Sequence, residues 1–299
     1  MSITVSLLPH ERSKEIALIA EGVREDFGAA GGGSGDGISA DKAEPEYIAK
    51  ASGLTLSYGH YGSAFDGMLE YARGRFHIYC NIERAGHKSS ARARFTLAHE
   101  LGHYYIDEHR NVLVSGRIPP HQSLCEFESK LDVEREADVF ACDLLMPMPL
   151  FRAHAEKEER GLAGILKLAD RFGTSITSTA IRYVRSGVAP CAVMKWNHDG
   201  RAWQSLSAET YRRRFRRAIS SADDLPHGCP TARALARESA PENGIFRAGS
   251  TASFWFQNVT ADPSRDIILI EEAIALGRFG VLTLLYPDSR SRGGDLKIS

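Results

Sequence analysis

The feature that most constrains this chain is the segment Phe95–Tyr105, which contains the pattern His-Glu-x-x-His at His99, Glu100 and His103. In a helix, side chains four positions apart lie on one face, about 6 Å apart along the axis. Two imidazoles at that spacing can converge on one metal ion, and a carboxylate beside the first can face a water that the ion activates. The pattern therefore predicts a helix here, a metal site, and Glu100 as the general base.

The alternative explanation of the pattern is a pair of histidines on the surface of an ordinary helix. The neighbouring residues argue against it, because they are small or apolar and suit a buried helix: Ala91, Phe95, Ala98 and Gly102. Ser89 or Ser90 could cap this helix, which we expect to run to about Ile106. The sequence thus favours a buried pair of histidines.

The spacing of apolar residues and the positions of Gly and Pro predict the secondary structure of the first 190 residues. Apolar spacing predicts helices at residues 10–26, 45–51 and 124–146, and two short helices within residues 161–187 around Gly173. Residues 67–82 predict two strands that turn at Arg73-Gly74. The glycine-rich residues 28–37 are typical of a flexible linker.

A zinc site needs a third protein ligand and keeps its fourth position open for water. His109 lies at the spacing of the extended HExxHxxGxxH pattern, but the glycine of that pattern is replaced here by Ile106. Glu134, on the helix predicted at residues 124–146, is the other candidate, and Asp138 follows it on the same face. We favour Glu134 over His109, and expect Asp138 to accept a hydrogen bond from a ligating imidazole. Glu136 is expected to point elsewhere on that helix.

Composition and charge exclude several classes of function. The formal net charge of -1 gives no general attraction for nucleic acid or for an anionic membrane. The N-terminus lacks the features of a signal peptide, and no apolar run approaches the roughly 18 residues that span a bilayer. The five cysteines are widely spaced and form no Cys-x-x-Cys pair, which argues against a disulfide framework. We therefore expect a cytoplasmic protein with reduced thiols.

The sequence changes in character from Pro190 onward, where apolar and β-branched runs predict a smaller α+β domain. The chain as a whole is predicted to be α+β, with a zincin-like helical domain and a small β-hairpin or sheet. Its four expected parts are an N-terminal helix and linker (1–43), a metal domain (44–150), a helix-turn-helix-like segment (151–188) and a C-terminal domain (189–299).

Several segments together resemble the ImmA/IrrE family of metallopeptidases. The resemblance is strongest at the two predicted metal-site helices, and it covers about residues 45–187. The segments that carry it are Phe95–His103, Glu134–Ala141, Leu144–Pro147, the hairpin at residues 67–82 and residues 168–175.

The resemblance implies a gluzincin-like fold that holds one zinc ion, with Glu134 as the third ligand beside His99 and His103. The family more often has Asn at the position of Asp138, and Asn can also accept a hydrogen bond. Members of this family cut helix-turn-helix repressors and thereby release stress-response or mobile-element genes. Some carry a GAF-like C-terminal sensor domain, which residues 189–299 resemble only in their pattern of apolar and β-branched runs. The chain is thus expected to be a zinc endopeptidase whose substrate is such a repressor.

Two other functions remain compatible with the sequence: a regulator that binds DNA or a protein partner without cutting it, and a peptidase of broad specificity. The intact Glu100 argues against an inactive site. The predicted recognition helix begins at Ile176 without Arg or Lys in its first turn, so we do not expect direct DNA binding. The ion could also be manganese or another divalent metal, because the order of affinities does not decide occupancy.

Overall fold

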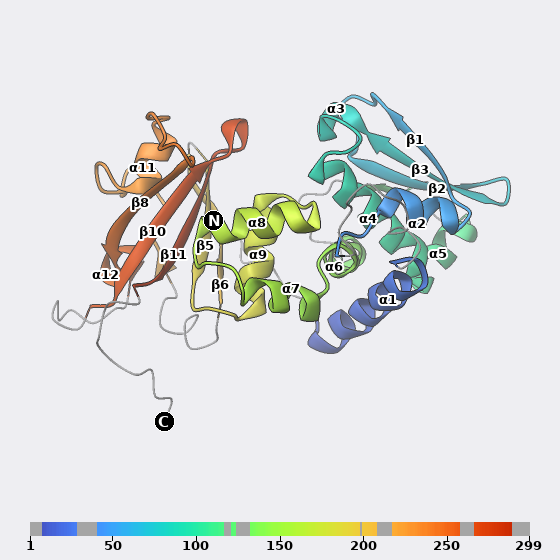
Figure 1. Ribbon diagram of the computed structural model, residues 1–299. Coiled ribbons are helices and arrows are strands. Elements are labelled where there is room, and N and C mark those ends of the chain that lie inside the picture. Colours follow the sequence, from blue (N-terminus) through green and yellow to red (C-terminus); the bar gives the residue numbers. More distant parts are fainter. Residues whose placement is uncertain are drawn as a thin grey trace. The chain divides into compact units, whose positions relative to one another are not determined.

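The computed structural model describes residues 8–28, 41–116, 121–123, 132–197, 199–207, 217–257 and 266–288 (Figure 1). The chain divides into two compact units built from non-contiguous pieces. The N-terminal unit falls within Val5–Phe151 and Leu168–Ser178, and the C-terminal unit falls within Arg152–Lys167 and Thr179–Ser299. The four parts that the sequence predicts, residues 1–43, 44–150, 151–188 and 189–299, stay predictions. The predicted glycine-rich linker lies outside the described residues from residue 29 onward.

A four-stranded sheet forms one layer of the N-terminal unit, in the order β1-β3-β2-β4. β1 pairs in parallel with β3, whereas β2 is antiparallel to both β3 and β4. The predicted hairpin is confirmed, since Arg73 and Gly74 both have positive φ angles, 52° and 78°, as a two-residue turn of this hand requires. The strands are Thr55–Gly59, Gly67–Ala72, Arg75–Asn81 and His121–Ser123.

Helix α4 (Ala91–Tyr105) packs against β2 and β3 of this sheet, and it also packs against α6 (Asp132–Leu145). The Ser90 side chain caps α4 by accepting a hydrogen bond from the backbone N–H of Ala93 at 3.0 Å. Every residue from Ala93 to His103 is buried, as the apolar flank of the motif predicts. The predicted start of α6 at residue 124 lies outside the described residues.

Four further helices complete this part of the chain. α1 packs along α6, and α2 packs against α4 and β1. α4 ends at Ile106, whose φ and ψ of -76° and 110° are extended rather than helical. α5 begins at the next residue, and this helix was not predicted from the sequence. The bounds are His10–Gly28 for α1, Pro45–Ala51 for α2, Ile82–Ala85 for α3 and Asp107–Val114 for α5.

The two short helices predicted around Gly173 are confirmed as α8 (Leu162–Phe172) and α9 (Ile176–Ser186), preceded by α7 (Met148–Ala155). Gly173 has a φ of 63°, which a side chain would strain. Arg185 is the one exposed residue of α9. The would-be recognition helix therefore presents little of its surface to solvent.

The C-terminal unit contains a five-stranded antiparallel sheet in the order β6-β5-β11-β10-β8, whose core includes Trp196, Phe246 and Trp255. The predicted α+β character of this part of the chain is confirmed. Within the described residues, no helix is long and apolar enough to cross a bilayer. The elements are β5 (Ala192–Asn197), β6 (Gly200–Leu206), β7 (Arg217–Ala218), α11 (Pro230–Leu235), β8 (Ile245–Thr251), α12 (Ala252–Trp255), β9 (Phe256–Gln257), β10 (Ile268–Ala275), the 3-10 helix η2 (Gly277–Phe279) and β11 (Val281–Pro287).

Candidate metal centre

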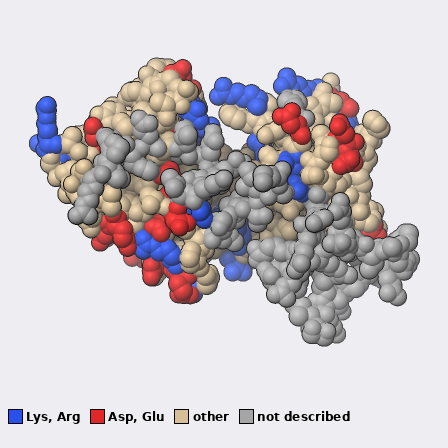
Figure 2. All heavy atoms as spheres, turned by 180° about the vertical axis from the view of Figure 1, so that it is seen from behind, with Lys and Arg blue, Asp and Glu red and all other residues tan. Residues whose placement is uncertain are grey.

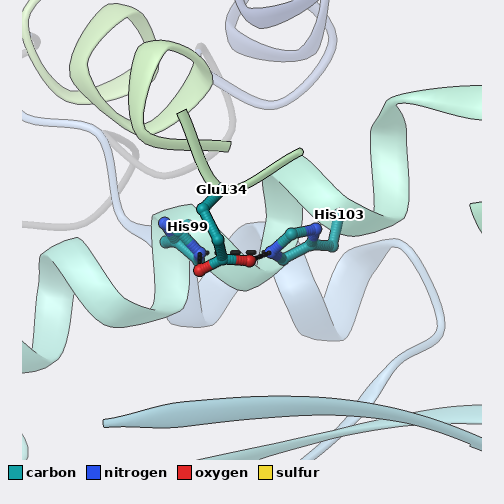
Figure 3. Close-up of side chains that lie close together, drawn as sticks. All are labelled: His99, His103 and Glu134. Carbon is teal, nitrogen blue, oxygen red and sulfur yellow. Dashed lines mark hydrogen bonds and ion pairs between the residues drawn. The ribbon is translucent and has the colours of Figure 1, made fainter. Parts of the chain in front are cut away.

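Three buried side chains of the N-terminal unit converge on one point: His99 and His103 from α4, and Glu134 from the facing helix α6 (Figure 3). The Nε2 atoms of the two imidazoles lie 3.1 Å apart. The Glu134 carboxylate lies 3.4 Å from Nε2 of His99 and 3.2 Å from Nε2 of His103. Two imidazoles and one carboxylate are a donor set that zinc takes in catalytic sites.

The spacing of these donor atoms fits a tetrahedral ion. A metal–ligand distance of about 2.0–2.1 Å places neighbouring tetrahedral ligands about 3.3 Å apart. The three observed separations, from 3.1 to 3.4 Å, lie around that value. The three residues could therefore hold one metal ion with a fourth position left for another ligand.

The far nitrogens of the two imidazoles are both engaged. Nδ1 of His99 lies 2.9 Å from the Asp138 carboxylate, one helical turn after Glu134 on α6. Nδ1 of His103 lies 3.2 Å from Nδ1 of His109, and Nε2 of His109 lies 3.0 Å from the Glu136 carboxylate. Because a carboxylate only accepts, the Asp138 contact requires a proton on Nδ1 of His99. Its Nε2 lone pair then faces the cluster.

The cluster attracts positive charge. Burial lowers the pKa of the His99 imidazole, but hydrogen bonds to Asp138 and Glu134, together with the charge of Glu100, outweigh burial. The pKa of His99 is therefore raised well above its ordinary value. Such a site favours a bound cation, either a proton or a metal ion. Burial also lowers the pKa of His109, although its Glu136 contact opposes this shift.

Glu100 is fully buried where α4 faces the first residue of β2. A Cβ atom on Gly67 would lie only 2.5 Å from Oε1 of Glu100 and 2.5 Å from Cγ2 of Thr96. Burial raises the pKa of the Cys80 thiol on β3 to about 12, and the charge of Glu100 adds to this effect. The absence of a side chain at Gly67 therefore leaves the space that the Glu100 carboxylate occupies.

Asp66 holds the backbone in place just before Gly67. Its buried carboxylate accepts hydrogen bonds from Arg84 at 2.9 Å and from Arg92 at 3.0 and 3.1 Å. Its backbone N–H donates to the carbonyl of Ser123 on β4 at 2.8 Å. Burial raises the pKa of the Asp66 carboxyl, but the two arginines outweigh burial and lower it. Asp66 thereby links the edge of the sheet to the start of α4.

The structure brings together Glu134 and the two motif histidines. It also places the Asp138 carboxylate within hydrogen-bonding distance of Nδ1 of His99. His109, the other candidate ligand, lies behind His103 and contacts its far nitrogen. Glu136 is not one of the three converging residues, and its carboxylate contacts His109 instead. The sequence carried no signal for this contact, since it depends on the angle at which α5 leaves α4.

Residues 82–183 match the model of the IrrE N-terminal-like domain, peptidase family M78. The match confirms the resemblance to the ImmA/IrrE family over that segment, which includes all three residues of the cluster. It ends before residue 189, so the GAF-like character of the C-terminal domain stays a prediction.

No curated protein matches the chain. Among solved structures, a Mycobacterium tuberculosis transcriptional regulator is similar, with a TM-score of 0.52 and 14% sequence identity. The alignment covers 93% of this chain and 77% of that chain. At this level of identity, the similarity concerns the fold alone.

Proposed function

We propose, on the premise that residues 82–183 form an IrrE N-terminal-like domain, that this chain is a zinc-dependent endopeptidase. The observation that carries the proposal is the convergence of two imidazole Nε2 atoms and the Glu134 carboxylate at one buried point beside Glu100. His99, His103 and Glu134 would hold the ion. A catalytic zinc site keeps its fourth position open for water, and Glu100 beside His99 would supply the base that such a site needs.

In the proposed reaction, zinc would lower the pKa of a water molecule and polarise a peptide carbonyl. Glu100 accepts the proton of that water as it attacks, and then donates the proton to the departing amine. Asp138 holds His99 with its proton on Nδ1, so that Nε2 remains available as a ligand. The buried position of Glu100 strengthens its interaction with the developing charge, because the surroundings have a low dielectric constant.

The proposed substrate is a helix-turn-helix repressor, with release of stress-response or mobile-element genes as the consequence. The IrrE N-terminal-like match supports this choice of substrate class. Direct DNA binding is disfavoured, because only Arg185 of α9 is exposed. On the face shown in Figure 2, the described Lys and Arg side chains are interspersed with Asp and Glu.

The test is a pull-down from the native host with Glu100→Gln as a substrate trap, since this change removes the base and leaves the three ligands intact. Bound proteins are identified by mass spectrometry and then offered to the zinc-loaded wild-type protein. We expect one helix-turn-helix repressor to dominate, and the wild type to cut it at defined positions. Glu25→Gln, which changes an exposed carboxylate on α1, is the matched control and should cut as the wild type does.

Five results would each overturn part of this proposal. Cleavage by Glu100→Gln at the wild-type rate would remove Glu100 from the mechanism, and a full equivalent of zinc in His99→Ala would remove that ligand. Digestion of unfolded casein without a captured partner would point to a broad peptidase. Capture of a partner that is never cut, or a salt-dependent band shift with duplex DNA, would point to a regulator that acts by binding.

A further inference from the structure

The two motif histidines have different partners on their far nitrogens. Nδ1 of His99 contacts a carboxylate, that of Asp138, at 2.9 Å. Nδ1 of His103 contacts another imidazole, that of His109, at 3.2 Å. An imidazole can either donate or accept at Nδ1, so His109 orients His103 only if its own proton is held in place.

That proton is held by Glu136. Nε2 of His109 lies 3.0 Å from the Glu136 carboxylate, which can only accept, so Nε2 of a neutral His109 carries the proton. Nδ1 of His109 is then an acceptor, and Nδ1 of His103 must donate to it. The Nε2 lone pair of His103 consequently faces Glu134 and His99, which is the arrangement that a ligand requires.

Glu136 is itself clamped from α1. The Arg12 guanidinium donates to its two carboxylate oxygens at 3.0 and 2.8 Å, in the two-pronged geometry typical of Arg and carboxylate. Arg12 also contacts Glu108, which lies next to His109 on α5. Arg12 belongs to α1, which lies outside the segment that matches the IrrE N-terminal-like domain.

We propose that Arg12, Glu136 and His109 form a positioning chain that presents His103 to the metal with its Nε2 lone pair toward the ion. The proposal rests on the metal site described under the proposed function. It assigns a role to α1 beyond packing, since this helix would influence the metal affinity of His103 through Glu136 and His109.

The competing explanation is that Arg12 merely docks α1 onto α6. Arg24 provides the matched control, because it also belongs to α1 and donates to the backbone of α6, at the carbonyl of Leu144 at 3.1 Å. Another of its hydrogen bonds also goes to a backbone carbonyl, that of Asp41. Loss of α1 docking should affect Arg24→Met and Arg12→Met alike, whereas loss of the positioning chain should affect Arg12→Met alone.

The experiment measures zinc affinity of the full chain by competition with a chromogenic chelator, and observes the Nδ1 proton of His103 by NMR. The decisive variants are His109→Phe, which keeps a ring but has no acceptor, and His109→Gln, which can accept from His103 and donate to Glu136. We expect His109→Phe and Glu136→Ala to weaken zinc binding about 10-fold or more. His109→Gln should recover most of that loss, and the His103 proton should be lost only where no acceptor remains.

The outcomes separate the two proposals. A wild type that binds no zinc refutes the metal site itself. Stoichiometric zinc binding by the wild type, with unchanged affinity and an unchanged His103 proton in His109→Phe, refutes the positioning chain alone. Equal weakening by Arg24→Met and Arg12→Met also refutes it. If His109→Phe does not fold, Glu136→Ala and Arg12→Met decide the question by the same two readouts.

Discussion

Gly67→Ala tests the close approach of β2 and α4 on which the position of Glu100 depends. The added Cβ would lie 2.5 Å from Oε1 of Glu100 and from Cγ2 of Thr96, whereas ordinary contact begins at 3.4 Å. The neighbours would have to retreat by about 0.9 Å in a closely packed interior. Thr96 is short, β-branched and held in a helix, where few χ1 rotamers are allowed, so it has little freedom to move aside. We expect a loss of about 2–3 kcal/mol in the free energy of unfolding, the upper part of the range for overpacking.

The matched control is Gly249→Ala on β8, where an added Cβ would meet nothing within 4 Å. This variant should be neutral or stabilising by about 0.4–1 kcal/mol, because alanine restricts the unfolded chain. Urea unfolding followed by far-UV circular dichroism detects the helices around the site. The three tryptophans, Trp196, Trp203 and Trp255, all belong to the C-terminal unit, so their fluorescence follows that unit separately.

We expect Gly67→Ala to lower the midpoint seen by circular dichroism and to leave the fluorescence midpoint close to that of the wild type. Adding Thr96→Ser, which removes Cγ2, should recover part of the loss and give a coupling energy of about 0.5–3 kcal/mol. Peptide cleavage should also fall by about 100-fold, as expected for a 1 Å displacement of the base. A Gly67→Ala protein as stable as Gly249→Ala would refute the close approach of β2 and α4.

Three further predictions concern other parts of the structure. Asp138→Ala should weaken zinc binding by about 10–100-fold, because His99 loses the acceptor that fixes its proton, and chelator competition measures this. Asp66→Asn should cost about 3 kcal/mol at pH 7 in urea unfolding, since it leaves two arginines without their buried partner. The folded state lowers the pKa of Asp66, so the stabilisation is complete above the unfolded value of about 3.9 and disappears as pH falls through the folded value. The difference between the variant and the wild type should therefore shrink in acid, and a constant difference would contradict this. Cys191, whose pKa burial raises to about 12, should resist thiol reagents at pH 8 until urea exposes it.

Much of the candidate site could be predicted because its parts are local in sequence. The helix spacing alone placed His99 and His103 on one face with Glu100 beside them, and the spacing of Glu134 and Asp138 placed both on one face of a second helix. The observed turn at Arg73-Gly74 was also predictable, since two-residue hairpin turns have strong sequence preferences. These features depend on the helical and strand repeats, which a chain carries wherever it packs.

The contacts of His109, Glu136 and Arg12 could not be predicted in this way. They depend on the backbone angles at Ile106, where α4 ends and α5 begins. They also depend on the packing of α1 against α6, which brings Arg12 to Glu136 although the two residues are 124 positions apart in sequence. The sequence by itself determined which side chains share a helix face, because that follows from the helical repeat. Only the tertiary structure decided which faces meet, because the packing of distant helices selects one arrangement among the many that the same local patterns allow.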